Sequence, residues 1–240
     1  ALSAKGEEFA DVLKMGRTEN QDAVPMTLGQ EFSAYAEMVG SGMDALKRNS
    51  EEFLSINMGA TAIGTGLNSP PGYADLVTEK LREVSGFQVQ LADNLVEATQ
   101  DCGAFAQMSG TLKRSAVQIS KICNDLRWLS SGPRTGIAEI RLPSLQPGSS
   151  IMPGKVNPVM SEMMMQVAAQ VIGNDTAITW GGANGNFELN VMMPLIAHNL
   201  LESIELLANA ADTFRERCIV GIEADVERAR DLAERNIIVV

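Results

Sequence analysis

Two serines, a lysine and an asparagine lie together in a stretch rich in glycine and proline, Gly148 to Pro158, with the sequence GSSIMPGKVNP. Helix and strand interiors do not tolerate this mixture of glycine and proline, so the stretch is predicted to be a loop. Glycines let a loop backbone approach a ligand closely, and hydroxyl, ammonium and amide groups can bind an anion or move a proton. The stretch is therefore a candidate site for chemistry, although a long turn between two helices is the plainer interpretation.

Long helices must position this loop, because apolar residues recur at spacings of three and four along most of the chain. In the longest early run, Thr27 and Gln30 are spaced as in a capping box. No segment shows convincing alternation of apolar and polar residues, so the sequence predicts an all-α fold, an extended bundle of long helices, with residues 1–240 as one domain. The predicted helices cover about residues 27–56, 73–85, 94–129, 159–177, 190–214 and 225 to the end.

A second glycine-rich segment, Gly59 to Asn68, breaks the helical pattern with the sequence GATAIGTGLN. Its glycines indicate a backbone in close contact with a neighbour. That neighbour is a ligand, another chain, or this chain itself at a tight connection between helices. The residues alone leave these alternatives open. The segment lacks the third glycine and the flanking strand of a dinucleotide-binding motif.

Composition limits the classes of partner. The chain has 240 residues, 45% of them hydrophobic and 5% aromatic, with 13 methionines, which favours aliphatic packing between helices. A net charge of −11 argues against nucleic acid or an anionic membrane as partner. No apolar run is long enough to span a bilayer. The three cysteines, Cys102, Cys123 and Cys218, show no CxxC spacing and are predicted to be reduced core residues of a cytoplasmic protein.

Several other features are weak candidates for a site. The single histidine, His198, lies on an apolar helix and is interpreted as a structural residue. One histidine excludes a multi-histidine metal site and a Ser-His-Asp triad built on this chain alone. Glu223, Asp225 and Glu227 are most simply the solvated start of a helix. The chain lacks an initiator methionine and ends on four apolar residues, 237–240, so we expect it to be a fragment.

Five blocks, in order along the chain, carry a resemblance to a known family. They are GRTENQDAVPMTLGQE (16–31), GATAIGTGLN (59–68), NDLRWLSSGPR (124–134), GSSIMPGKVNP (148–158) and GNFELNV (185–191). The chain resembles the fumarase/aspartase superfamily, whose members eliminate an amine or water to release fumarate. The resemblance implies the central helical domain of a chain about twice as long, with the N-terminal and C-terminal domains absent. It also implies a homotetramer in which each active site takes residues from three subunits.

The resemblance further implies a role for individual residues toward a small dicarboxylate substrate. Ser149 would be the catalytic base, acting as an alkoxide, and Ser150 would add a hydroxyl donor. Lys155 and Asn157 would hold a substrate carboxylate and the aci-carboxylate formed from it. The remaining implied residues are Thr18, contributed by another subunit to bind the second carboxylate or the leaving group, and Glu162, which would support the loop lysine and serine. No metal or organic cofactor is implied.

The leaving group is the point on which the family divides. Fumarases of this class are similar in having histidine directly after GRT, where this chain has Glu19. In an ammonia-lyase, the Glu19 carboxylate would bind the substrate ammonium; the alternative is that it faces a basic residue of a neighbouring subunit and never contacts substrate. Stretches such as VPMTLGQEF and ATQDCGAF are more similar to aspartases, whereas GGANGNFELN is more similar to fumarases. The resemblance therefore favours release of ammonia from aspartate, a step of aspartate metabolism. The alternatives are fumarate hydration, or a non-catalytic helical scaffold such as the lens crystallins of this superfamily.

Overall fold

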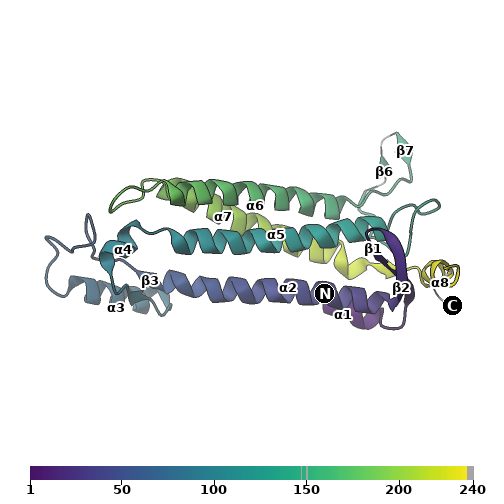
Figure 1. Cartoon of the computed structure of the whole chain (residues 1–240), viewed down its shortest axis with the longest axis horizontal. Helices are drawn as coiled ribbons and strands as arrows, with labels where there is room; N and C mark the ends of the chain where they lie inside the picture. Colours follow the sequence, from purple (N-terminus) through teal and green to yellow (C-terminus); the bar gives the residue numbers. More distant parts are fainter. Residues whose placement is uncertain (147, 150, 237–240) are drawn as a thin grey trace. The chain divides into compact units, whose positions relative to one another are not determined.

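The computed structural model describes residues 1–146, 148–149 and 151–236. Helices dominate this part of the chain, which confirms the predicted all-α class (Figure 1). The α-helices are α1 (Leu2–Glu8), α2 (Leu28–Ser50), α3 (Tyr73–Ser85), α4 (Leu95–Gln100), α5 (Gly103–Leu129), α6 (Val159–Ala183), α7 (Met193–Arg217) and α8 (Val226–Glu234), with short 3-10 helices η1 (Glu51–Leu54) and η2 (Ile219–Gly221). None of these helices is both long and apolar enough to cross a membrane.

The start of α2 has the predicted capping box. The Gln30 N–H donates to Thr27 Oγ1 at 3.2 Å, and the Thr27 N–H donates to Gln30 Oε1 at 3.0 Å. Each side chain thus satisfies a backbone donor that the first helical turn leaves without a partner. The other end differs from the prediction, because α2 stops at Ser50 and the chain continues as η1.

The helix predicted over residues 94–129 is two helices, α4 and α5. The break falls at Asp101 and Cys102, where the Asp101 backbone is extended. Its carboxylate Oδ2 accepts a hydrogen bond from the Gly103 N–H at 2.8 Å and so begins α5. The helices predicted at 159–177 and 190–214 are longer or shifted, since α6 reaches Ala183 and α7 begins at Met193.

Strands are short, and the sequence did not predict them. The longest pair is the antiparallel hairpin of β1 (Leu13–Thr18) and β2 (Gln21–Thr27). Glu19 and Asn20 connect these strands with φ values of 53° and 60°, as in a two-residue type I′ turn. The other pairs are β3 (Ser55–Ile56) with β4 (Gln90–Leu91), β5 (Ile140–Arg141) with β8 (Glu223–Ala224), and β6 (Gly148–Ser149) with β7 (Met152–Pro153).

Contacts between residues divide the chain into two compact units, and no boundary between them is marked in the sequence. Among the described residues, unit 1 contains 1–41, 116–169 and 206–236. Its core includes Phe9, Phe32 and Tyr35, whose rings meet edge to face at 5.3 and 5.6 Å between centroids. The Tyr35 hydroxyl donates to Asp125 Oδ2 at 2.8 Å. Burial and the neighbouring carboxylates of Glu31 and Asp125 raise the pKa of Tyr35.

Unit 2 contains residues 42–115 and 170–205. Phe53 and Phe105 meet edge to face at 5.3 Å within it. A buried carboxylate, Asp175, accepts hydrogen bonds from Ser109 Oγ at 2.8 Å and from Lys113 Nζ at 2.5 Å. The charge of Asp175 is thus compensated inside the unit.

The glycine-rich segment 59–68 lies in unit 2 and contacts this chain itself. Gly64 has φ +89°, and a Cβ placed on it would lie 2.3 Å from Val96 Cα. Gly59 has φ +85°, and a Cβ there would lie 2.8 Å from the Ala74 Cβ. Both positions combine a backbone conformation that favours glycine with space for glycine only. Of the three neighbours considered above, contact within the chain accounts for these two glycines.

All three cysteines are buried and free, as the sequence predicted. Burial raises the pKa of Cys123 and of Cys218 to about 12, and burial also raises the pKa of Cys102. Their thiols are therefore protonated at neutral pH and act as small apolar groups in the core.

Candidate active site

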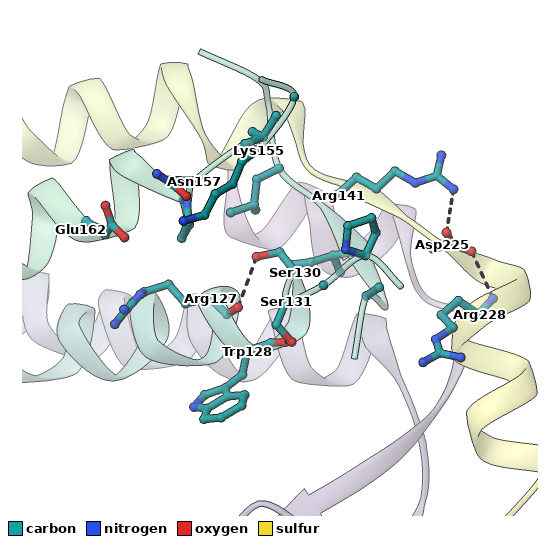
Figure 2. Close-up of a pocket in the computed structure, with 18 of the residues that line it drawn as sticks. Arg127, Trp128, Ser130, Ser131, Arg141, Lys155, Asn157, Glu162, Asp225 and Arg228 are labelled. Carbon is teal, nitrogen blue, oxygen red and sulfur yellow. Dashed lines mark hydrogen bonds and ion pairs between the residues drawn. The ribbon is translucent and has the colours of Figure 1, made fainter. Parts of the chain in front are cut away.

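A pocket of about 1080 Å³ lies in unit 1 beside the lysine-containing end of the 148–158 loop (Figure 2). One wall is the C-terminal end of α5 together with the segment that follows it, up to Leu142. The opposite wall is formed by residues 153–158 and by Glu162 on α6. Asp225 and Arg228, at the start of α8, complete the rim.

Three residues to which the family resemblance assigns a role line this pocket: Lys155, Asn157 and Glu162. Lys155 and Asn157 are exposed, and Glu162 is half-buried in the first turn of α6. Lys155 forms no ion pair with any described residue, and Figure 2 shows its side chain on the same side of the pocket as Asn157 and Glu162. An ammonium, an amide and a carboxylate thus share one wall.

Local backbone geometry explains why this loop needs its glycines. The β6–β7 hairpin extends from the chain just before α6 (Figure 1). Gly148 has φ +102°, and a Cβ there would lie 3.0 Å from the backbone nitrogens of Gly154 and Lys155. Gly154 has φ +83°. At the other end, the Asn157 carbonyl accepts from the Val159 N–H at 2.9 Å, which leads the loop into α6.

The two serines cannot be placed in the same way. The backbone of Ser149 lies in β6 opposite Met152, but its side chain is outside what the structure describes. Ser150 lies outside the described residues altogether. The proposed base and the proposed hydroxyl donor therefore stay predictions.

Thr18 and Glu19 lie at the tip of the β1–β2 hairpin, both exposed. Thr18 pairs with Gln21 across the turn. Neither residue is among those that line the described pocket, so the chain alone does not bring them to Lys155. The resemblance expects Thr18 to come from another subunit, and it stays a prediction.

Arg127 was not assigned a role from the sequence, although it belongs to the NDLRWLSSGPR block. It is half-buried on α5 and lines the wall facing Lys155 and Glu162 (Figure 2). Its Nη1 donates to Asn124 Oδ1 at 3.4 Å and lies 3.5 Å from Met165 Sδ, both long contacts. Arg127 therefore adds a cation to the wall facing Lys155, in addition to Arg141 and Arg228 at the rim. Its membership of the NDLRWLSSGPR block is the signal that could have identified it.

An ion pair and several hydrogen bonds fix the rim of the pocket at α8. Asp225 caps α8 by accepting from the Arg228 N–H at 3.1 Å, and it pairs with Arg141 at 2.6 Å. The hydrogen bond from Arg141, followed by that from the Arg228 backbone, lowers the pKa of Asp225. Arg228 in turn donates from Nε and Nη2 to the Ile137 and Gly136 carbonyls at 3.0 and 2.9 Å. Asp225 therefore begins a helix, as the sequence indicated.

A buried charge cluster joins the β1–β2 hairpin to the segment after α5. Glu139 is fully buried and accepts two hydrogen bonds from the Arg17 guanidinium, at 2.8 and 3.0 Å. Lys14 Nζ, only 2% exposed, lies 3.4 Å from Glu139 and 2.6 Å from Glu31. Burial opposes the charge on Arg17, but the carboxylates of Glu139, Asp22 and Glu31 together outweigh burial and raise the pKa of Arg17. Nothing in the sequence pattern indicated this cluster.

His198 is exposed on α7, within unit 2, and does not line the pocket. Among the described residues, no group of three or more histidine, cysteine or acidic side chains is placed to hold a metal ion.

Residues 1–173 match a protein family described as lyase. The chain belongs to this lyase family. Its relatives place it in the fumarase/aspartase superfamily, as the five blocks predicted. The chain is 59% identical over 238 residues to the aspartate ammonia-lyase of Pseudomonas aeruginosa, covering 99% of this chain and 50% of the relative. It is 55% identical over 223 residues to the aspartate ammonia-lyase of Escherichia coli K12, covering 93% of this chain and 47% of the relative.

Solved structures of this lyase family have the same fold. The fumarate lyase:delta crystallin of Brucella melitensis bound to cobalt has a TM-score of 0.96 at 52% identity, covering 98% of this chain and 51% of that chain. The class II fumarase of Schistosoma mansoni has a TM-score of 0.96 at 34% identity, covering 99% and 53%. This chain thus spans about half the length of the relatives that it matches.

Proposed function

We propose that the protein containing this chain is an aspartate ammonia-lyase, which eliminates ammonia from L-aspartate to give fumarate. The observation that carries the proposal is 59% identity, over almost the whole chain, to a relative that bears this name. The pocket supports it, because Lys155 and Arg127 place positive charge in a protein with a net charge of −11. A small dianion needs such a local cluster, since the overall field repels it.

In the proposed reaction, Ser149 is the base. Its alkoxide takes a proton from C3 of aspartate, and the C–H electron pair moves onto the adjacent carboxylate to give a dianionic aci-carboxylate. That pair then forms the C2–C3 double bond as the C2–N bond breaks and the amine leaves as ammonia. Ser149, now protonated, returns its proton to solvent. Backbone donors and the charge of Lys155 stabilise the alkoxide in a dry site.

Lys155 and Asn157 hold the carboxylate that becomes the aci-carboxylate. Their interaction strengthens as the second negative charge develops, so it contributes more in the transition state than in the ground state. Ser150 adds a hydroxyl donor. Glu162, half-buried on the same wall as Lys155, supports the lysine and the loop serine. No metal or organic cofactor enters this mechanism.

Thr18 and Glu19 act from the hairpin tip of a neighbouring subunit. Thr18 binds the second carboxylate or the leaving group. The Glu19 carboxylate accepts hydrogen bonds from the substrate ammonium and so favours an amine over a neutral hydroxyl. The exposure of both side chains, and their absence from the pocket of their own chain, support a site shared between subunits.

The assembly that we propose is a cytoplasmic homotetramer with a shared helical core. Support comes from large apolar side chains that the single chain leaves exposed on its long helices: Met43 (64%), Val117 (53%), Trp180 (64%) and Leu201 (65%). Each of the four long helices thus leaves a large apolar side chain available for packing against another subunit.

The test is a product assay of the whole protein with L-aspartate, following fumarate by its ultraviolet absorbance and ammonia in parallel. Equal amounts of fumarate and ammonia are expected. Turnover of malate or fumarate without ammonia would favour fumarate hydratase, the activity that GGANGNFELN and the Schistosoma mansoni fumarase suggest. Turnover of neither substrate would favour a scaffold.

A further inference from the structure

We propose that Glu139 is a positioning residue that fixes the β1–β2 hairpin, and with it Thr18 and Glu19, to the wall of the pocket. The expected effect on kcat/KM rests on the proposed function, whereas the anchoring of the hairpin by Glu139 does not. Glu139 touches no substrate in this account. It acts through Arg17, the neighbour of Thr18.

The side chain of Glu139 binds the β1–β2 hairpin. Its two carboxylate oxygens accept from the two terminal nitrogens of Arg17, at 2.8 and 3.0 Å. Lys14, on the same strand, lies 3.4 Å from one of those oxygens. Residues three apart in a regular strand face opposite sides, but the register shifts between Met15 and Arg17, and both cations reach one carboxylate.

The backbone of Glu139 is hydrogen-bonded to the elements that form the pocket wall. Its N–H donates to the Leu129 carbonyl, at the last residue of α5, at 2.8 Å. Its carbonyl accepts from the Asp225 N–H at 2.8 Å, where α8 begins. The residues on either side, Ala138 and Ile140, line the pocket. Glu139 is thus held on both sides by elements that form the pocket wall.

Burial makes this link rigid. Glu139 is 0% exposed, Lys14 is 2% exposed and the Arg17 side chain is 17% exposed, so water has no access to the Glu139 carboxylate and little to its partners. Bidentate pairing with a guanidinium also fixes orientation, which a single ammonium contact does not. The hairpin tip is exposed and makes a tight two-residue turn, so its direction depends on where its base is anchored.

The test compares Glu139→Gln and Arg17→Lys with Asp175→Asn in the whole protein. Asp175 is the matched control, since it is also a buried carboxylate paired with a lysine but lies in unit 2. Arg17→Lys weakens the same Arg17–Glu139 pair from the hairpin side but retains the positive charge. It therefore provides the test if Glu139→Gln does not fold. The readouts are amide hydrogen exchange over residues 16–24 and kcat/KM for aspartate, each alone and combined with Thr18→Ala.

Both link variants are expected to exchange faster than wild type over residues 16–24, whereas Asp175→Asn exchanges at the wild-type rate there. They are expected to lower kcat/KM by about 100-fold, the scale of a misplaced contact group. When Thr18→Ala is already present, adding a link variant is expected to lower kcat/KM by less than about a further threefold. Both changes remove the same contribution, which is that of Thr18 to the site. Unchanged hairpin exchange, or losses that multiply with Thr18→Ala, would overturn the positioning role. A wild-type protein inactive on aspartate but with the expected exchange pattern would overturn only the proposed function.

Discussion

Lys155 contributes an ammonium group to the pocket without an ion pair to any described residue. A cation held in this way costs little to direct at a ligand, because no protein carboxylate has to be displaced first. Asn157 and Arg127 add neutral and charged donors around it. The pocket is therefore suited to an anion, and the charge of Lys155 is the part of it that can be removed most cleanly.

Replacing Lys155 by alanine is expected to lower kcat for aspartate by about 1000-fold, because the aci-carboxylate loses its main counter-charge. Lys155→Arg is expected to retain a small fraction of the activity, since charge survives but the compact ammonium geometry does not. Steady-state kinetics of the whole protein measure both. Lys47→Ala, an exposed lysine on α2, is the control. Near-normal kcat/KM in Lys155→Ala would remove this loop from the substrate site.

Glu19 gives a second prediction at this scale. Glu19→Gln is expected to lower kcat/KM for aspartate about tenfold, or about 1.4 kcal/mol, the scale of one charge-assisted hydrogen bond. Glu19→His is expected to add only trace malate dehydration, because the rest of the amine site is unchanged. An unaltered aspartate rate in Glu19→Gln would place this carboxylate outside the site.

Sequence reasoning identified some site residues and missed others for a physical reason. Lys155, Asn157 and Glu162 lie within or next to one recognisable loop, and all three line the pocket. The Arg17–Glu139 pair joins residues 122 positions apart, and no local pattern reports such a contact. Glu139 in particular is a single charged residue between two apolar ones. In a sequence, this pattern cannot be told apart from that of an exposed residue.

At the scale of elements, helices were predictable where one apolar stripe and a cap coincide, as at Thr27 and Gln30 in α2. The break between α4 and α5 was missed because apolar spacing continues across it, although Asp101 two residues before Gly103 is a recognisable cap. The β1–β2 hairpin was missed because burial does not alternate along β1, where Lys14, Met15 and Gly16 are buried in succession. Lys14 is buried and Leu13 is exposed, so the buried face of β1 contains a cation paired with acids.

Substituting two glycines of the 59–68 segment is expected to lower the free energy of unfolding by different amounts. Gly64→Ala is expected to destabilise the fold by about 3 kcal/mol or more, since it combines a strained φ with a clash against the Val96 backbone. Gly66→Ala is the matched control. It has φ +66° but its nearest neighbour would be 3.7 Å away, so only the conformational cost of about 1 kcal/mol is expected. Denaturant unfolding measures both, and equal losses would contradict the contact with α4.

The cap of α8 gives a pH-dependent prediction. Asp225→Ala is expected to cost about 1 kcal/mol at neutral pH through loss of the helix cap. The folded-state pKa of Asp225 is lowered, so its charge stabilises the fold above the unfolded-state value near 3.8. That contribution is lost as pH falls through the lower folded-state pKa. Urea unfolding at about pH 7 and about pH 3 should show the cost shrinking on acidification. A cost that grows instead would contradict the pairing with Arg141.

At the scale of the whole molecule, the fold class followed from the sequence but the division into two units did not. Helices α2, α5, α6 and α7 each contribute residues to both units, so no linker or change in composition marks the boundary. Oligomeric state is the prediction that belongs here. Sedimentation is expected to show a tetramer at micromolar concentration, and Leu201→Glu is expected to weaken it, because a charge would replace an exposed apolar contact. A stable wild-type monomer would contradict the shared site.

The central claim is that ammonia, not water, is the leaving group. Its most direct test is the ratio of kcat/KM for L-aspartate to that for L-malate, measured with one preparation of the whole protein. We predict a ratio above about 100, or roughly 2.7 kcal/mol of transition-state discrimination. A ratio near or below one, with efficient formation of fumarate from malate, would contradict the account.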